Sequence, residues 1–477
     1  MVRLYAKGMT PVVCPGCQQR DQRIRELEQR VGDLEGQVRE LLARLGTNAT
    51  NSSIPPSANP PGAPKPVTKQ PTGRKAGGQP GHPPCLRQRL PAERVSHAIV
   101  HAPSHCDRCH EPLPALPGPE DPAPTWHQVA DLPTVAAEIT EHQGHYRTCS
   151  CCGTLNHAPI PQAVKAHCLG PRLAAVLVYL AGSHHVSCRG LEEIARDVFD
   201  VPLSLGSIAH LREQMTAALE PAHVEALAAV RAAAVKNVDE TSWKLAGDLC
   251  WLWVAATDRV AAFLIHAHRG QDALAALLGE QLRGLVCSDR WSAYGRLSPF
   301  CRQVCWAHLR RDFQKLVDRR GSSAPVGRAL LEVARQVFDE WHLFRGGSGD
   351  RIQLQRRLEG PAQELERLLQ VGRRCADKKT VTFCKNLLGL LPAVWRFVVS
   401  DGVEPTNNHA ERLLRRGVLW RKNAFGSASV AGCRLVERLL TVVQTCRLQG
   451  RSVLGYLYEA LVAHRNRLPA PALLPVE

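Results

Sequence analysis

A run of short apolar segments between residues 234 and 294 constrains the fold most strongly. It reads as three strands, a helix and a fourth strand, with the sequences "AVKNVDETSW", "LCWLWVAATD", "VAAFLIHAH", "DALAALLGEQL" and "GLVCSDRWSAY". Strands that follow one another with short breaks and then continue through a helix predict a mixed sheet. The predicted fold class is therefore α/β. A fifth strand in "RQVCWAHLRRDF" leads into a helical insertion over about 308–400.

Two aspartates stand at the ends of predicted strands, Asp239 in the first and Asp289 in the fourth. Sites in open α/β sheets are assembled at strand ends, and a strand order of 3-2-1-4 would make these two strands neighbours. An aspartate in such a place can also simply cap the next turn. As a pair, they predict a shared hard divalent cation, Mg²⁺ or Mn²⁺, and a third acidic ligand.

The third acid is Glu411, which stands in the strongly basic segment "NNHAERLLRRGVLWRKNAFGS". Residues 407–451 hold nine Lys or Arg and only two acids, so a cation between Glu411 and a polyanion would explain the glutamate. Thr406 or Asn407 can cap a helix there, with Glu411 about one turn inside it. Four residues then share one helical face: Asn408, Glu411, Arg412 and Arg415.

Other acids and other basic groups near this position leave alternatives open. Asp312, Asp401 and Glu404 are the other acids that could take the third place, and Asp312 could equally form a surface ion pair. We expect Arg412 and Arg415 near the metal, and Arg421 and Lys422 on DNA phosphates farther along. Trp420 and Phe425 could contact DNA bases or belong to the core. His308 and His409 could assist proton transfer or bind phosphate.

The N-terminal part predicts an oligomer. Residues 18–46 repeat apolar side chains in a 3-4 alternation, which is typical of a short parallel coiled coil and predicts a homodimer or higher oligomer. The alternative is an amphipathic helix packed on its own domain. Residues 47–90 are rich in proline and basic, so we expect an extended linker. The alternating positions are Ile24, Leu27, Val31, Leu34, Val38, Leu41 and Leu45.

Two Cys-x-x-Cys pairs predict a structural zinc ion in a domain over residues 91–165. The proposed ligands are Cys106, Cys109, Cys149 and Cys152, because two such pairs supply four thiolates to a tetrahedral site. Cys151 could replace Cys152 as a ligand. A further pair, Cys14 and Cys17, has no evident partner pair, so its role stays open.

Residues 170–230 predict a helical DNA-binding region that contains a helix-turn-helix. One helix carries apolar residues at Leu191, Ile194, Ala195 and Val198, a break follows in "DVPL", and Ser204 can cap a second helix. Any helical hairpin can imitate this pattern. If it reads DNA, the exposed candidates for contact are Ser207, His210 and Arg212.

Charge and hydropathy indicate which class of binding partner and which cell compartment to expect for the protein. The chain has 60 Lys and Arg against 44 Asp and Glu, a formal charge of +16, which makes DNA the expected partner class. The longest apolar run, "LAAVLVYLAG", is far below the roughly 20 residues of a membrane span, and the N-terminus does not read as a signal peptide. Eighteen cysteines, many single in apolar stretches, fit a reducing cytoplasm.

Several motifs in one order resemble the transposases of the bacterial insertion-sequence family numbered 66. They are "NSSIPPS", "GGQPGH", "VDETSW", "CSDRWSAY", "CWAHLRRDF", "NNHAER", "RKNAFGS" and "VERLLTVVQTCRLQGRSVLGYL". The resemblance implies an RNase H-like core whose DDE triad falls on Asp239, Asp289 and Glu411. It also implies a leucine zipper, a zinc-binding region and a helix-turn-helix ahead of the core, in a nucleoid-associated bacterial protein.

The function expected from this resemblance is DNA transposition. Two Mg²⁺ ions at the triad would support cleavage at the ends of an insertion sequence and transfer of the freed strand into target DNA. Whether accessory transposition proteins take part is open. The alternatives are an RNase H-like structure-specific nuclease and a non-catalytic zinc and helix-turn-helix regulator. The expected catalytic domain covers 231–425, and a C-terminal helical region covers 426–477.

Overall fold

The computed structural model describes residues 15–45, 88–133 and 135–475. The chain divides into two compact units, of which the smaller comprises residues 67–139 and 197–201 and the larger comprises the rest. Each unit is described by itself. No helix within the described ranges is both long and apolar enough to cross a membrane.

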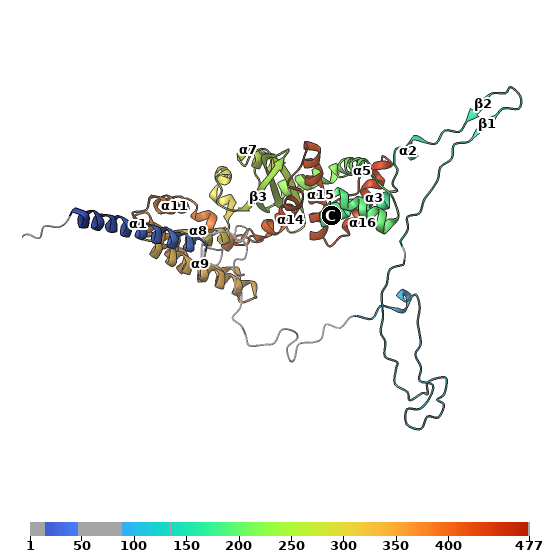
Figure 1. The fold of residues 1–477 in the computed structure, drawn as a ribbon, viewed down its shortest axis with the longest axis horizontal. Coiled ribbons are helices and arrows are strands. Elements are labelled where there is room, and N and C mark those ends of the chain that lie inside the picture. Colours follow the sequence, from blue (N-terminus) through green and yellow to red (C-terminus); the bar gives the residue numbers. More distant parts are fainter. Residues whose placement is uncertain (1–14, 46–87, 134, 476–477) are drawn as a thin grey trace, which may run out of the picture. The chain divides into compact units, whose positions relative to one another are not determined.

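A five-stranded mixed sheet forms the centre of the larger unit (Figure 1). Its strands are β3 (Val235–Leu245), β4 (Asp248–Ala256), β5 (Ala261–His266), β6 (Leu285–Ser288) and β7 (Arg302–Val304). The order is β5-β4-β3-β6-β7, antiparallel from β5 to β3 and parallel from β3 to β7. The predicted α/β class is confirmed, and the first and fourth strands of the segment are neighbours. Asp239, however, lies in the middle of β3 rather than at its end.

The sheet packs closely against helix α14 (Asn408–Ala424), which contacts β3 and β4. Gly417 allows this approach, because a Cβ at that position would lie 2.3 Å from Cδ2 of Leu252 on β4. Helix α7 (Gln271–Leu278) packs on β4 and β5. Strand β4 therefore ends in a run of buried residues, from Leu252 to Ala256, instead of alternating buried and exposed ones.

The outer strand β5 is capped by helix α15 (Val430–Leu448) through three polar side chains. Glu437, Thr441 and Thr445 accept hydrogen bonds from the backbone N–H groups of Ile265, Phe263 and Ala261, at 2.6, 3.0 and 3.1 Å. Four residues of helix rise about 6 Å and two residues of strand about 6.6 Å, so the two spacings match. The edge of the sheet is thereby satisfied without another strand.

A helical insertion separates β7 from α14, as the sequence predicted. Its helices are α8 (Trp306–Asp318), α9 (Ser323–Arg345), α10 (Arg351–Gly372), α11 (Lys378–Leu388), α12 (Leu391–Val394) and α13 (Arg396–Val399). They share a core that includes Phe313, Leu330 and Leu365. The two ends of the insertion meet, because the N–H of Trp306 donates to the carbonyl of Pro405 at 2.8 Å. After α14 the chain continues through α15 and α16 (Val453–Arg465).

The chain between residues 162 and 232 leads into the sheet through a series of helices: α2 (Gln162–Lys165), α3 (Pro171–His184), α4 (Cys188–Phe199), α5 (Leu205–Ala218) and α6 (Glu220–Ala232). The predicted pair of short helices corresponds to α4 and α5. Ser204 caps α5 by accepting a hydrogen bond from the N–H of Ser207, as expected. Val198, predicted on the apolar face of α4, is 51% exposed.

The N-terminal helix α1 spans Pro15–Leu45 and covers the predicted coiled coil. Its described apolar side chains, Ile24, Leu27, Val31 and Leu34, are all exposed. The side chains of Cys17, Val38, Leu41 and Leu45 lie outside the described set, as do Cys14 and nearly all of the predicted linker. Shorter elements are η2 (Ala92–Arg94), β1 (Tyr146–Thr148), β2 (Leu155–His157), η3 (Ser292–Arg296) and η4 (Pro299–Cys301).

Replacing Thr441 by valine should destabilise the larger unit by about 1–3 kcal/mol, because the buried N–H of Phe263 loses its acceptor. Thr382→Val is the matched control, since its hydroxyl bonds to the carbonyl of Lys378 on an exposed helix face. The shift in urea midpoint measures both effects. Equal midpoints for the two variants would mean that the edge contact adds no stability.

Candidate active site

The parallel pairing of β3 and β6 brings Asp239 and Asp289 together. The recorded pairs run from Val235 with Leu285 to Asn237 with Cys287, a constant offset along the two strands. Two residues farther, the same register places Asp239 beside Asp289, which follows β6 directly. Neighbouring strands lie about 4.8 Å apart, so the two carboxylates emerge side by side.

Asn407 fastens the start of α14, the helix that carries Glu411, to β3. The Asn407 side chain donates to the carbonyl of Val238 at 2.7 Å and accepts from Nδ2 of Asn237 at 2.9 Å. Its backbone N–H donates to Sγ of Cys305 at 3.2 Å. Asn407 is the N-cap residue of α14, but its buried side chain caps the neighbouring strand rather than its own helix. Sequence reasoning missed this role.

The charges of neighbouring acids raise the pKa values of Asp239 and Glu411. Burial raises the pKa of Asp239 well above its usual range, and the negative charges of Glu240, Asp289 and Glu411 add to the effect. Burial also raises the pKa of Glu411, which Asp289 raises further although Arg311 opposes it. Carboxylates that repel one another in this way are stabilised when a cation lies between them.

The surroundings of Glu411 fit a divalent cation. Its side chain is 37% exposed, yet Oε1 is buried and has no hydrogen-bond partner among the described residues. The nearest basic groups are Nδ1 of His308 at 3.5 Å and the guanidinium of Arg311 at 3.8 Å. Burial, reinforced by Arg311, lowers the pKa of His308 to about 4, so its imidazole is neutral at pH 7. Carboxylate oxygens without donors are the ligands that Mg²⁺ prefers.

The other candidate acids are engaged in ion pairs. Arg290 donates to Asp312 at 2.8 and 3.0 Å, and Lys315 donates to it at 2.9 Å. Asp401 pairs with Arg351 at 2.7 Å, and Glu404 pairs with Arg345. Among these candidates, Glu411 is the acid whose charge contributes to the raised pKa of Asp239.

Comparison with known proteins assigns the chain to a family. The description "Transposase IS66 family" matches residues 167–434, more than half of the chain and a range that includes all three acids. The chain belongs to this transposase family. The resemblance carried by the sequence motifs is thus confirmed. A family of unknown function, DUF6444, matches residues 16–88.

Two relatives come from Sinorhizobium fredii (strain NBRC 101917 / NGR234). The chain is 27% identical to the uncharacterized protein y4qI over 47% of its own length and 46% of the relative. It is 24% identical to the uncharacterized protein y4hP over 66% of its own length and 63% of the relative. The chain thus covers less than two thirds of either relative.

Arg302 supports Asp289 in this family member from the start of β7. The buried guanidinium donates to the backbone carbonyl of Asp289 at 2.5 Å, to Oγ of Ser288 at 3.2 Å and to the carbonyl of Tyr294 at 3.2 Å. Burial lowers the pKa of Arg302 to about 10, so it remains charged at neutral pH. Oδ1 of Asp289 accepts from the N–H of Trp291 at 2.8 Å. The only sequence signal for this role of Arg302 was the presence of an arginine inside a predicted apolar strand.

A second buried acid, Glu240, lies next to Asp239 and points to the opposite face of β3. It accepts from Nε of Arg269 at 2.8 Å and from the Tyr294 hydroxyl at 2.7 Å. The Arg269 guanidinium lies 4.7 Å from the ring centre of Trp251 and 3.9 Å from that of Trp291. This cluster, which sequence reasoning also missed, joins the residues that follow both aspartates.

The predicted DNA-contact residues near the acids fall into two groups. Asn408, Arg412, Arg415 and Lys422 are exposed on α14. Arg421 is half-buried and donates to the side chains of Thr241 and Ser242 on β3. Trp420 is buried beside His185, and the His409 side chain lies 2.7 Å from the carbonyl of Thr257, so both are engaged within the protein. The Phe425 side chain, in contrast, is 80% exposed.

The predicted contacts on the α4–α5 pair differ in exposure. His210 is exposed, whereas Ser207 and Arg212 are half-buried. Arg212 donates to Sγ of Cys188 at 3.3 Å, and the Ser207 hydroxyl lies 3.1 Å from that of Ser204. His210 is therefore the member of the three that is most open to a DNA backbone.

The first Cys-x-x-Cys pair forms a tight turn in the smaller unit. The N–H of Cys106 donates to the carbonyl of Glu111 at 2.9 Å, and the N–H of His110 donates to the carbonyl of Cys106 at 2.9 Å. His110 has a φ of 61°, a left-handed conformation that closes the turn. Hydrogen bonds from the backbone of Cys109 and Arg108 lower the pKa of the Cys106 thiol.

The second pair, in the larger unit, repeats the same pattern. The N–H of Cys149 donates to the carbonyl of Thr154 at 2.8 Å, and that of Gly153 donates to the carbonyl of Cys149 at 2.9 Å. Gly153 has a φ of 71°, matching His110 of the first turn. Cys152 corresponds to Cys109, and hydrogen bonds with Thr154 and Cys149 lower its thiol pKa. This correspondence favours Cys152 over Cys151 as the partner of Cys149.

The raised pKa of Asp239 predicts that Asp239→Asn stabilises the protein without divalent metal. A raised carboxyl pKa costs stability above the folded-state pKa, and that cost disappears as pH falls through it. At pH 8 in Mg²⁺-free buffer we expect a thermal midpoint about 2–4 °C higher, corresponding to roughly 1 kcal/mol. Mg²⁺ should raise the midpoint of the wild type and leave that of the variant unchanged.

Asp312→Asn provides a control of opposite sign. Burial alone would raise the pKa of Asp312, but Arg290 and Lys315 lower it overall, so neutralising this side chain should lower the thermal midpoint at pH 8. A lower midpoint for Asp239→Asn as well would contradict the view that Asp239 is a repelled carboxylate.

Proposed function

We propose that this member of the transposase family is a DDE-type DNA transposase with an RNase H-like core. Asp239, Asp289 and Glu411 would hold two Mg²⁺ or Mn²⁺ ions. The observation that supports the proposal is the electrostatic coupling of three carboxylates on neighbouring elements: the charges of Asp289 and Glu411 raise the pKa of Asp239, and Asp289 also raises that of Glu411. Bound there, the ions would activate an attacking oxygen and neutralise charge on the leaving oxygen.

The reaction would exchange phosphodiester bonds without a covalent protein intermediate. Water breaks a P–O bond at the transposon end and frees a 3′-hydroxyl, and that hydroxyl then replaces one strand oxygen of the target DNA. The chain's own residues fix the geometry: Arg302 holds the backbone of Asp289, and Asn407 holds the helix that carries Glu411. Arg412 and Arg415, exposed on the same helix, would bind the backbone phosphates.

His308 supports metal binding by remaining neutral. A protonated imidazole 3.5 Å from Glu411 would compete with a cation for Oε1, and the low pKa of His308 removes that competitor at pH 7. Arg311 is the charged neighbour that remains, at 3.8 Å. A partly exposed contact of that length is weak and is readily replaced by a divalent ion.

The other regions would bring DNA and a second chain to this site. We propose that α4 and α5 form a DNA-binding helix-turn-helix, that the exposed apolar stripe of α1 pairs with another copy in a coiled coil, and that Cys106, Cys109, Cys149 and Cys152 hold a structural Zn²⁺. The substrates would be the element's ends and target DNA in the bacterial nucleoid. Under the same proposal, accessory transposition proteins would take part in the reaction.

Each of Asp239→Asn, Asp289→Asn and Glu411→Gln should lower Mg²⁺-dependent strand cleavage by on the order of 10³-fold or more and leave DNA affinity unchanged. Labelled DNA carrying the element's own ends, incubated with a target plasmid, measures cleavage and joining together. Asp401→Asn, an exposed acid paired with Arg351, is the matched control and should retain activity.

Three results would argue against the transposase assignment. Full cleavage by Glu411→Gln would remove that residue from the site. Cleavage without joining to the target would favour a nuclease, and specific DNA binding with neither reaction would favour a regulator.

The two similar Cys-x-x-Cys turns predict that the zinc content of the protein depends on Cys106, Cys109, Cys149 and Cys152. Cys106→Ser and Cys152→Ser should each lose one Zn²⁺ per chain, because each removes one of four thiolates. Cys151→Ser should keep the ion, since Cys151 has no equivalent in the first turn. Metal analysis of the purified proteins measures the difference, and zinc loss in the Cys151 variant alone would reverse the assignment.

A further inference from the structure

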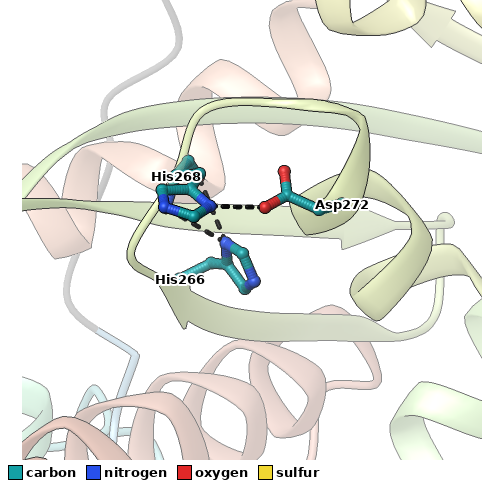
Figure 2. A group of neighbouring side chains, drawn as sticks. All are labelled: His266, His268 and Asp272. Atoms are coloured by element: carbon teal, nitrogen blue, oxygen red, sulfur yellow. Dashed lines mark hydrogen bonds and ion pairs between the residues drawn. The ribbon is translucent and has the colours of Figure 1, made fainter.

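The loop between β5 and α7 gathers three side chains that commonly bind metals (Figure 2). His266 is the last residue of β5, His268 lies in the loop, and Asp272 is in the first turn of α7. One donor atom from each lies within 4.8 Å of the other two. His268 Nδ1 is 2.5 Å from Oδ2 of Asp272, and the His268 N–H donates to Nδ1 of His266 at 3.1 Å.

We propose that His266, His268 and Asp272 bind one transition-metal ion, such as Zn²⁺ or Ni²⁺, at a site separate from the three catalytic acids. Two imidazoles and one carboxylate suit these ions and not Mg²⁺, which takes oxygen ligands. Figure 2 shows the side chains of His268 and Asp272 facing each other, with His266 beside them. Bonding of the ion through Nδ1 of His266 would replace the hydrogen bond from the His268 N–H.

The position of Arg269, directly after His268, means that an ion bound in this loop would also order the residues around Arg269. Arg269 follows His268 directly, and its side chain is the one that pairs with Glu240 and stacks on Trp251 and Trp291. Its carbonyl also accepts from Nε1 of Trp291 at 3.0 Å. An ion that closes residues 266–272 into a ring therefore orders the segment that fixes the neighbours of Asp239 and Asp289.

The exposure of His268 and Asp272 distinguishes this site from a buried polar cluster. His268 and Asp272 have side-chain exposures of 72% and 51%, so an ion can enter without any rearrangement of the core. The same exposure means that the His268–Asp272 pair alone adds little stability. The third donor, His266, is what distinguishes this cluster from an ordinary surface ion pair.

Metal counting without DNA tests the site, so its result does not depend on the proposed transposase activity. Protein loaded with one equivalent of Zn²⁺ per chain, which the four cysteine thiolates take in preference to histidine and carboxylate ligands, is titrated calorimetrically with Ni²⁺. We expect one Ni²⁺ per chain for the wild type and an affinity at least about tenfold lower for His266→Ala, His268→Ala and Asp272→Asn. Ni²⁺ should also raise the thermal midpoint of the wild type and not that of the three variants.

His210→Ala is the matched control, since His210 is an exposed histidine of α5 that lies 3.8 Å from Glu213 of the same helix, away from the β5–α7 loop. It should bind Ni²⁺ like the wild type. Equal affinity for all proteins would overturn the proposal. Loss of binding in His268→Ala together with full binding in both His266→Ala and Asp272→Asn would also overturn it, because one surface imidazole would then account for the ion.

Discussion

The parallel register of β3 and β6 is the constraint on which the site depends. Continued two residues beyond the recorded pairs, it brings Asp239 next to Asp289, whose negative charge helps to raise the pKa of Asp239. This arrangement of charges is unfavourable, and contacts around the acids stabilise it. Arg302 binds the backbone of Asp289, Asn407 joins β3 to α14, and Thr441 satisfies the outer strand β5.

Much of the architecture could be predicted from the sequence because it depends on local pattern. Short apolar runs marked the strands of the sheet, and a helical pattern with Ser204 before it marked α5. The neighbourhood of the first and fourth strands followed from one topological rule. Glu411 stood out because an acid inside a basic helix requires a reason, and the helix begins where the sequence placed it.

The supporting contacts could not be predicted, because their partners lie far apart in the chain. Asn407 and Val238 are separated by 169 positions, and Thr441 and Phe263 by 178. Periodicity tells which face of an element is buried but not which backbone group a polar side chain meets there. Asp239 was misplaced at a strand end for a related reason: β3 continues along β4 after its pairing with β6 has stopped, and only the partner strands decide that length.

The contact between the two ends of the helical insertion has a further consequence. Trp306 meets Pro405, and Cys305 meets Asn407, so the chain leaves the sheet and returns to it at one point. The position of α14 is therefore fixed by contacts made at this point, and of the insertion only α8 adds neighbours of Glu411, namely His308 and Arg311. The helices after α8 could therefore change in length, during evolution or by design, while the three acids keep their places.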